Sequence, residues 1–323
     1  GHTITLGGFG SLSVQAGSQL NLGSEDGSDT LMISGGNKQG NDVPGLLYIQ
    51  GSCNMYPGVT IADRKGNNYF GGGVTVQGGE FHMHGGTINN CGITGGSMCY
   101  GGGVAVIYGG SFIMDGGEIT DCFATSSFKA ADYGMDSRII TSAGGGVYVS
   151  GGSSFIMNGG TISNNKAGYG GAVSAYAADN YWHGNTSIQL SGNAQIKDNI
   201  ARNYGGAICL FGNNAQNYTD TLTMSGGMIS GNKALAVVYS GDGAYIMSEN
   251  EDLGFLMPEE GTNLWYDAMV MTKDCENTEL AYEFMDFMLR DDVAYRNTQY
   301  VGYSSPVVAA YEQAQEEDYE GIE

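Results

Sequence analysis

Short runs of alternating apolar and polar residues, separated by glycine-rich corners, recur along residues 1–234. One such run follows a Gly-Gly-Gly corner, as in Val74-Thr75-Val76 and Val104-Ala105-Val106. Alternation with a period of two is typical of a strand that buries one face and exposes the other to water. Because no stretch of ten residues in this part has a helical period, the pattern predicts short strands throughout.

Two more runs complete the repeating unit. The second run places a methionine or leucine two residues after a large apolar residue, and the third run is centred on an isoleucine. The runs are Phe81–Met83, Phe112–Met114, Phe155–Met157, Ile188–Leu190 and Leu222–Met224, and then those around Ile88, Ile119, Ile162, Ile196 and Ile229. Three strands and three corners in roughly 26 to 30 residues describe one coil of a parallel β-helix.

Stacking the coils predicts columns of equivalent residues. The inward columns are Val74, Val104, Val147, Val173 and Ile208, and Phe81, Phe112, Phe155, Ile188 and Leu222. A further column holds Cys91, Cys122, Asn165, Asn199 and Asn232, in which the asparagine amides can stack at strand spacing. We favour two free thiols for Cys91 and Cys122 over a disulfide between coils, which would need close Cβ atoms.

The repeat resembles the right-handed parallel β-helices of bacterial surface proteins. Its Gly-Gly-Ala-[Val/Ile] and Ile-x-x-Asn elements are similar to the short repeats of chlamydial polymorphic outer-membrane proteins and of gut-bacterial adhesin-like proteins. The resemblance covers about residues 45–234, after more irregular coils. It implies a cell-surface module and says little about activity, because many functions share this fold.

The composition changes abruptly after residue 234. Residues 1–234 hold 50 of the 56 glycines and a net charge of -5, whereas residues 235–323 hold 6 glycines and a net charge of -17. We therefore predict two domains, a β-helix over 1–234 and a second piece over 235–323. The total charge of -22 argues against a nucleic-acid partner, and no apolar run is long enough to cross a bilayer.

The coils offer little that points to catalysis. Asp115, Glu118 and Asp121 lie in one coil, but their equivalents in other coils are merely polar, which is typical of a solvated face. His82 and His84 alternate on one strand face, and no third metal ligand is evident beside them. We therefore expect no catalytic residues, no metal and no cofactor. A polysaccharide lyase or hydrolase is the least favoured function.

Two insertions fall at the same corner of successive coils, at residues 176–186 and 211–220. The first insertion carries Tyr181 and Trp182. Insertions that stack on one face of a solenoid often mark a binding surface, and exposed aromatic rings can stack on a sugar or a protein. A surface glycan or protein is one expected partner, and packing of these rings against the coil is the alternative.

The residues after 234 have a different pattern. Continuous apolar runs predict strands at 235–242, 252–258 and 263–271. Asn277 or Thr278 can cap a helix that places Leu280, Phe284, Phe287 and Met288 on one face, and a short helix follows at about 291–298. The last residues, 316–323, are expected to be loose.

This segment resembles the C-terminal part of the spermidine/putrescine-binding receptors of ABC transporters. The resemblance rests on Leu235–Asp242, Met257–Thr262, Leu264–Asp267, Asn277–Arg290 and Val301–Pro306. It implies an α/β segment of a periplasmic-binding-protein-like fold and a polyamine or other small cationic solute as ligand. It also implies that Trp265 and Tyr303 are box aromatics, that Asp267 binds an ammonium group, and that Tyr239 takes a position where some relatives have Trp.

Such receptors have two lobes, and most of their chain precedes the part that is similar here. The β-helix stands in its place, so we expect an incomplete ligand site and strand edges without their usual partners. No linker separates the two parts, and natural recombination, a gene-assembly error and an engineered chimaera all remain open. The sequence begins Gly1-His2-Thr3, and we expect no signal peptide within it.

These observations predict a mainly β, non-enzymatic, extracytoplasmic protein, which is periplasmic, secreted or on the cell surface. The first expected function is solute binding of polyamine type, with an ABC-transporter permease as a partner. The second is an adhesin-like surface module that carries a receptor remnant.

Overall fold

The computed structural model divides the chain into two compact units, Gly1–Ala236 and Val237–Glu323, which are described separately. The residues that it describes are 1–6, 10–35, 39–40, 45–66, 70–95, 98–126, 140–177, 184–212, 217–234, 268–301 and 303–316.

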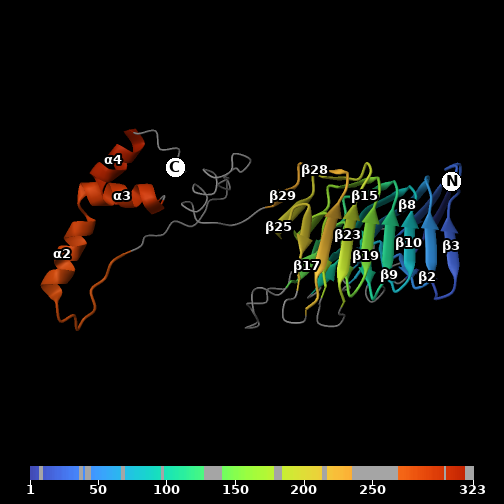
Figure 1. Cartoon of the computed structure of the whole chain (residues 1–323), viewed down its shortest axis with the longest axis horizontal. Helices are drawn as coiled ribbons and strands as arrows, with labels where there is room; N and C mark the ends of the chain where they lie inside the picture. The colour runs from blue at the N-terminus through green and yellow to red at the C-terminus, as the bar shows by residue number, and fades with distance from the viewer. Residues whose placement is uncertain are drawn as a thin grey trace. The chain divides into compact units, whose positions relative to one another are not determined.

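The described strands of the first unit form three all-parallel sheets (Figure 1). One sheet holds β2 (Leu12–Val14), β6 (Leu47–Ile49), β9 (Val74–Gln77), β13 (Val104–Ile107), β18 (Val147–Ser150), β22 (Val173–Tyr176) and β26 (Ile208–Leu210). A second holds β3 (Gln19–Leu22), β7 (Ser52–Met55), β10 (Glu80–Met83), β14 (Ser111–Met114), β19 (Ser154–Met157), β23 (Thr186–Leu190) and β27 (Asp220–Met224).

The third sheet has more strands, because several coils contribute two strands on either side of a bend. Its strands are β1 (His2–Thr5), β4 (Leu31–Ser34), β5 (Gln39–Gly40), β8 (Val59–Gly66), β11 (Thr87–Thr94), β12 (Cys99–Tyr100), β15 (Glu118–Thr120), β16 (Phe123–Thr125), β17 (Ser142–Ala143), β20 (Thr161–Ser163), β21 (Lys166–Tyr169), β24 (Gln195–Lys197), β25 (Ile200–Tyr204), β28 (Met228–Ser230) and β29 (Lys233–Ala234). The chain visits the three sheets in turn, which is the path of a parallel β-helix.

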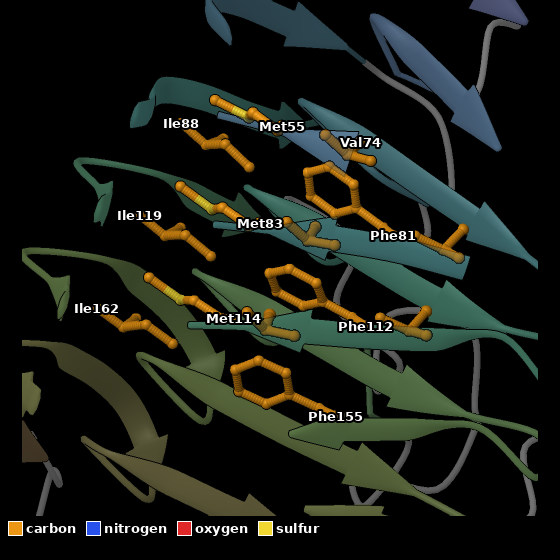
Figure 2. Packing of buried hydrophobic residues seen from close by; sticks show 14 of the residues in the cluster. Met55, Val74, Phe81, Met83, Ile88, Phe112, Met114, Ile119, Phe155 and Ile162 are labelled. Carbon is orange, nitrogen blue, oxygen red and sulfur yellow. The ribbon is translucent and has the colours of Figure 1, made fainter. Parts of the chain in front are cut away.

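The register of the strands places equivalent residues in columns, as the sequence predicts. Phe81 pairs with Phe112, and Phe112 with Phe155. Their rings stack at centroid distances of 5.1 and 4.9 Å, and all three are fully buried. Figure 2 shows these rings one above another, with columns of methionine and isoleucine alongside them. One apolar core therefore runs along the inside of the coils.

The glycine corners have two separate physical causes. Gly101 has a φ of 74°, a left-handed conformation that other residues adopt only at a cost. Gly102 has no such conformation, but a Cβ atom there would collide with the carbonyl oxygen of Gly145 on the next coil. The first glycine therefore makes the turn, and the second lets the two coils approach each other.

The predicted asparagine ladder is present inside the third sheet. The side-chain amide of Asn165 donates to Oδ1 of Asn199 at 2.9 Å, and that of Asn199 donates to Oδ1 of Asn232 at 2.8 Å. Cys91 and Cys122 occupy the same column, and both are free and buried. This confirms the free thiols that we favoured over a disulfide.

A second polar column explains residues that the sequence placed on a solvated face. Asp121 and its equivalents all have a left-handed backbone, with φ between 47° and 60°; they are Asp63, Asn90, Asn164 and Asp198. Asn and Asp tolerate this conformation better than other residues with a side chain. Asp121 therefore has a structural reason to be an aspartate, because the backbone is left-handed at this corner.

The described part of the second unit is helical. It contains α2 (Thr278–Met288), α3 (Asp291–Val301) and α4 (Val308–Glu316). The first two were predicted, and α4 was missed. Residues 268–271, the end of the third predicted strand, belong to no strand, so this part of the prediction was wrong. The other predicted strands, at 235–242, 252–258 and 263–267, and the predicted loose end after Glu316 lie outside the described residues.

The apolar face of α2 is largely open to solvent. Leu280 is 63% exposed, Phe284 56% and Phe287 48%, and no residue of this helix is buried. A helix with such a face normally buries it against another element. Among the described residues, no helix is long and apolar enough to cross a membrane.

Candidate functional site

One of the four predicted polyamine-site residues lies within the described part of the chain. Tyr303 is half-buried in the turn between α3 and α4. Tyr239, Trp265 and Asp267 lie outside the described residues, so their geometry stays a prediction.

The turn that carries Tyr303 is fixed locally. The backbone N–H of Val307 donates to the hydroxyl of Ser305 at 3.1 Å, which helps to start α4 after Pro306. Ala294 and Ala310 are buried in α3 and α4, which pack together. Tyr303 therefore stands on a junction of two packed helices rather than on a free loop.

The surface of these helices is acidic. Asp291 and Asp292 begin α3, and carboxylates in the first turn of a helix are stabilised by its dipole. Arg290 forms two hydrogen bonds of 3.0 Å to Asp292 and also lies over the ring of Phe287. This arrangement uses one of the three cations of residues 235–323, a segment whose net charge is -17.

The insertions of the β-helix occupy one corner, as the sequence predicts. The first follows β22 and the second follows β26, and these strands pair in register. Tyr181 and Trp182 lie outside the described residues. Phe211, at the start of the second insertion, packs edge-on against Tyr169 and Tyr176 at 5.2 and 5.9 Å. This described aromatic residue therefore packs against the coil.

A separate polar cluster lies on the outer face of two neighbouring coils. His82 belongs to β10, His84 follows it, and Asp115 follows β14 on the next coil. His82 Nε2 lies 2.6 Å from Asp115 Oδ2, and His84 Nδ1 lies 3.6 Å from the same oxygen. The two imidazole rings lie 3.8 Å apart between centroids. Both histidines thus share one carboxylate.

Neighbouring residues hold this cluster in place. The Asn158 amide donates to Asp115 Oδ1 at 2.8 Å, and the Ser191 hydroxyl donates to Asn158 Oδ1 at 2.9 Å. The ring of Tyr56 stacks on His84 with a centroid distance of 4.9 Å and an interplanar angle of 10°. Each partner occupies the same corner on a successive coil, so the β-helix itself aligns them.

The environment favours a neutral histidine and an ionised carboxylate. Burial lowers the pKa of His84, as does the neighbouring His82, while the charges of Asp115 and Glu25 act in the opposite direction. Burial by itself raises the pKa of Asp115, but hydrogen bonds from Asn158 and His82 outweigh it and leave this pKa below its usual value.

The sequence correctly aligned Asp115 with His84 and Asn158 in one column but found no third ligand beside the histidines. In the structure Asp115 lies beside both histidines, because His82 reaches it diagonally from the neighbouring coil. The signal in the sequence was a His-x-His pair with an acid 33 residues after the first histidine, about the length of one coil. Column alignment by itself does not reveal diagonal neighbours.

The C-terminal part of the chain is similar to a known protein family. Residues 175–321 match the model of the bacterial extracellular solute-binding protein family. The match begins within β22, although the strands from there to β29 continue the register of the β-helix. Over residues 175–321 the chain is therefore similar to part of a bacterial extracellular solute-binding protein. No solved structure matches the chain significantly.

The curated relatives of this segment are polyamine-binding proteins. A putrescine/agmatine-binding protein of Pseudomonas aeruginosa is 29% identical over 99 residues, which cover 29% of this chain and 27% of the relative. A norspermidine sensor of Vibrio cholerae is 36% identical over 78 residues, covering 23% and 21%. A spermidine/putrescine-binding periplasmic protein of Escherichia coli is 27% identical over 82 residues, covering 25% and 24%. The chain spans about a quarter of the length of these relatives.

Proposed function

We propose that the C-terminal segment binds polyamines and is a non-enzymatic, extracytoplasmic solute-binding segment joined to a β-helix. The observation that carries the proposal is the agreement among the relatives, whose names specify putrescine, agmatine, norspermidine or spermidine. The family description, an extracellular solute-binding protein, supports the extracytoplasmic location. A permease of an ABC transporter is the partner that a complete receptor of this type would have.

The chemistry of the segment suits a flexible dication. Aromatic faces attract ammonium groups by cation–π contacts, and carboxylates bind them by charge-assisted hydrogen bonds. Tyr239, Trp265 and Tyr303 would supply the aromatic faces, and Asp267 would bind one ammonium end. The net charge of -17 over residues 235–323 favours the approach of any small cation.

We further propose that this ligand site is incomplete. The segment corresponds to about a quarter of the curated relatives, and the exposed Leu280, Phe284 and Phe287 on α2 have the character of a surface that another element covers. A half-built site leaves one side of the ligand in water, so the affinity should be millimolar rather than that of a closed receptor.

Calorimetry of the full chain with spermidine and putrescine tests the proposal. We expect saturable binding in the millimolar range that Trp265→Ala and Asp267→Asn abolish. Asp274→Asn, which removes an exposed acid of the same unit, is the matched control for unspecific attraction and should leave binding unchanged. An absence of heat at millimolar ligand, or equal losses in Asp267→Asn and Asp274→Asn, would overturn the proposal.

A second candidate function is an adhesin-like surface module, with the receptor segment as a remnant. The observation in its favour is the placement of both insertions at one corner of successive coils, after β22 and β26. We expect Tyr181→Ala and Trp182→Ala to reduce retention of the chain on a glycan array. Phe211→Ala, which removes a ring packed against the coil, should not change it. Retention that is absent, or unaffected by the first two variants, would end this idea.

A further inference from the structure

Two histidines and one carboxylate on the outer face of the β-helix form the donor set of a metal site. One donor atom from each of His82, His84 and Asp115 lies within 4.8 Å of the others. We propose that these three residues bind one divalent transition-metal ion of the zinc class. This proposal concerns the β-helix and is independent of polyamine binding by the second unit.

The distances suit a tetrahedral ion after a small adjustment. Zinc bonds of 2.0 to 2.2 Å place neighbouring ligand atoms about 3.3 to 3.5 Å apart. The His84 Nδ1 to Asp115 Oδ2 distance, 3.6 Å, already matches. The His82 Nε2 to Asp115 Oδ2 distance, 2.6 Å, is that of a hydrogen bond and must widen by roughly 0.7 Å when an ion replaces the proton. Rotation of the Asp115 carboxylate, which is 39% exposed, permits this change.

Outer partners hold the proposed ligands in their binding geometry. Asn158 donates to Asp115 Oδ1, which leaves Oδ2 directed at both histidines. Tyr56 stacks on the His84 ring and limits its rotation. Metal-binding carboxylates and imidazoles are commonly held by hydrogen bonds or packing from neighbouring residues. Removing one such neighbour usually lowers the metal affinity 10- to 100-fold.

The donor set selects the class of ion. Imidazole nitrogen suits Zn²⁺, Ni²⁺ and Cu²⁺, whereas Ca²⁺ and Mg²⁺ require a shell of oxygen ligands. Three protein ligands leave a fourth position of a tetrahedral ion for water or an external donor. The side chains of His82 and His84 are 24% and 32% exposed, so solvent reaches this position. An open site of this kind differs from the closed four-ligand sites that only stabilise a fold.

The β-helix itself provides variants that preserve its structure. The strand position of His82 holds Asn54 on the preceding coil, and the corner position of Asp115 holds Asn158 on the next coil. Asparagine therefore fits every ligand position, and His82→Asn, His84→Asn and Asp115→Asn are the variants of choice. His2→Ala removes an exposed imidazole from β1 and is the matched control.

Calorimetric titration of the full chain with Zn²⁺, and separately with Ca²⁺, tests the proposal. We expect one equivalent of Zn²⁺ to bind, each asparagine variant to weaken this binding at least tenfold, and His2→Ala to leave it unchanged. Unchanged thermal unfolding of the asparagine variants would assign the loss to the ligands rather than to misfolding. Absence of saturable Zn²⁺ binding, equal binding of Ca²⁺, or full binding by the three asparagine variants would overturn the proposal.

Discussion

Asn165 shows how a single side chain joins three coils of the β-helix. Its Oδ1 accepts the backbone N–H of Cys122 at 2.9 Å, and its amide donates to the carbonyl of Ile119 at 3.0 Å and to Oδ1 of Asn199. Asn165 is fully buried, so these groups have no access to water. Because buried polar groups are costly when they lack a partner, the hydrogen bonds of Asn165 stabilise the bend of the coil that carries it.

We expect Asn165→Ala to lower the free energy of unfolding by about 2 kcal/mol, because the buried N–H of Cys122 loses its side-chain acceptor. Asn193→Ala, at an exposed corner, should change it by less than about 0.5 kcal/mol. Urea denaturation followed by circular dichroism measures both values. Equal effects of the two substitutions would contradict the role of the ladder.

Some residue positions could be predicted from the sequence and others could not. Columns such as Phe81, Phe112 and Phe155 could be predicted because each coil repeats the same inward position. The contact between His82 and Asp115 could not, since it joins two different columns and depends on how side chains lean at the corner. The left-handed backbone at Asp121 was also missed, because the sequence showed only that this position is polar.

Strand β14 combines a buried face with an outward face. In β14, Phe112 and Met114 are buried, whereas Ser111 and Ile113 are only partly so. The Phe112 ring lies between those of Phe81 and Phe155, so its contacts extend to both neighbouring coils. The free energy of unfolding of such a solenoid is approximately the sum of the intrinsic stability of each coil and the stability that contacts between neighbouring coils add.

Phe112→Ala should therefore destabilise the β-helix by about 3 to 5 kcal/mol, because it removes a fully buried ring from the middle of a stack. Ile113→Ala, on the outward face of the same strand, is the control and should cost less. The measurement is the urea midpoint of the β-sheet signal. A midpoint that shifts equally in both variants would show that the stack does not carry the stability assigned to it.

Elements of the second unit were harder to predict than those of the coils. The apolar spacing around Leu280 and Phe284 indicated α2 correctly, and the short helix predicted at about 291–298 corresponds to α3. α4 was missed because it carries no comparable apolar stripe; its few apolar residues are interrupted by Glu312 and by glutamines. A helix of this kind depends on packing against α3 rather than on its own pattern.

At the scale of the whole molecule, two compositions correspond to two kinds of structure. Residues 1–234 carry the glycine corners of stacked coils, whereas the acidic residues after 234 lie in a part that contains helices where it is described and that overlaps the match to the solute-binding protein family. The compact units divide between Ala236 and Val237, close to this change of composition. The β-helix could be predicted because its repeat occurs many times. The second part could be recognised only through its resemblance to a family.

We propose that the chain joins a β-helix to a segment that binds polyamines. Hydrogen–deuterium exchange of the full chain, with and without millimolar spermidine, tests it most directly. We expect strong protection of peptides from the β-helix strands in both samples, and slower exchange on adding spermidine only in peptides from residues 237–323. Spermidine effects within residues 1–236, no effect on any peptide, or rapid exchange of the β-helix strands would contradict it.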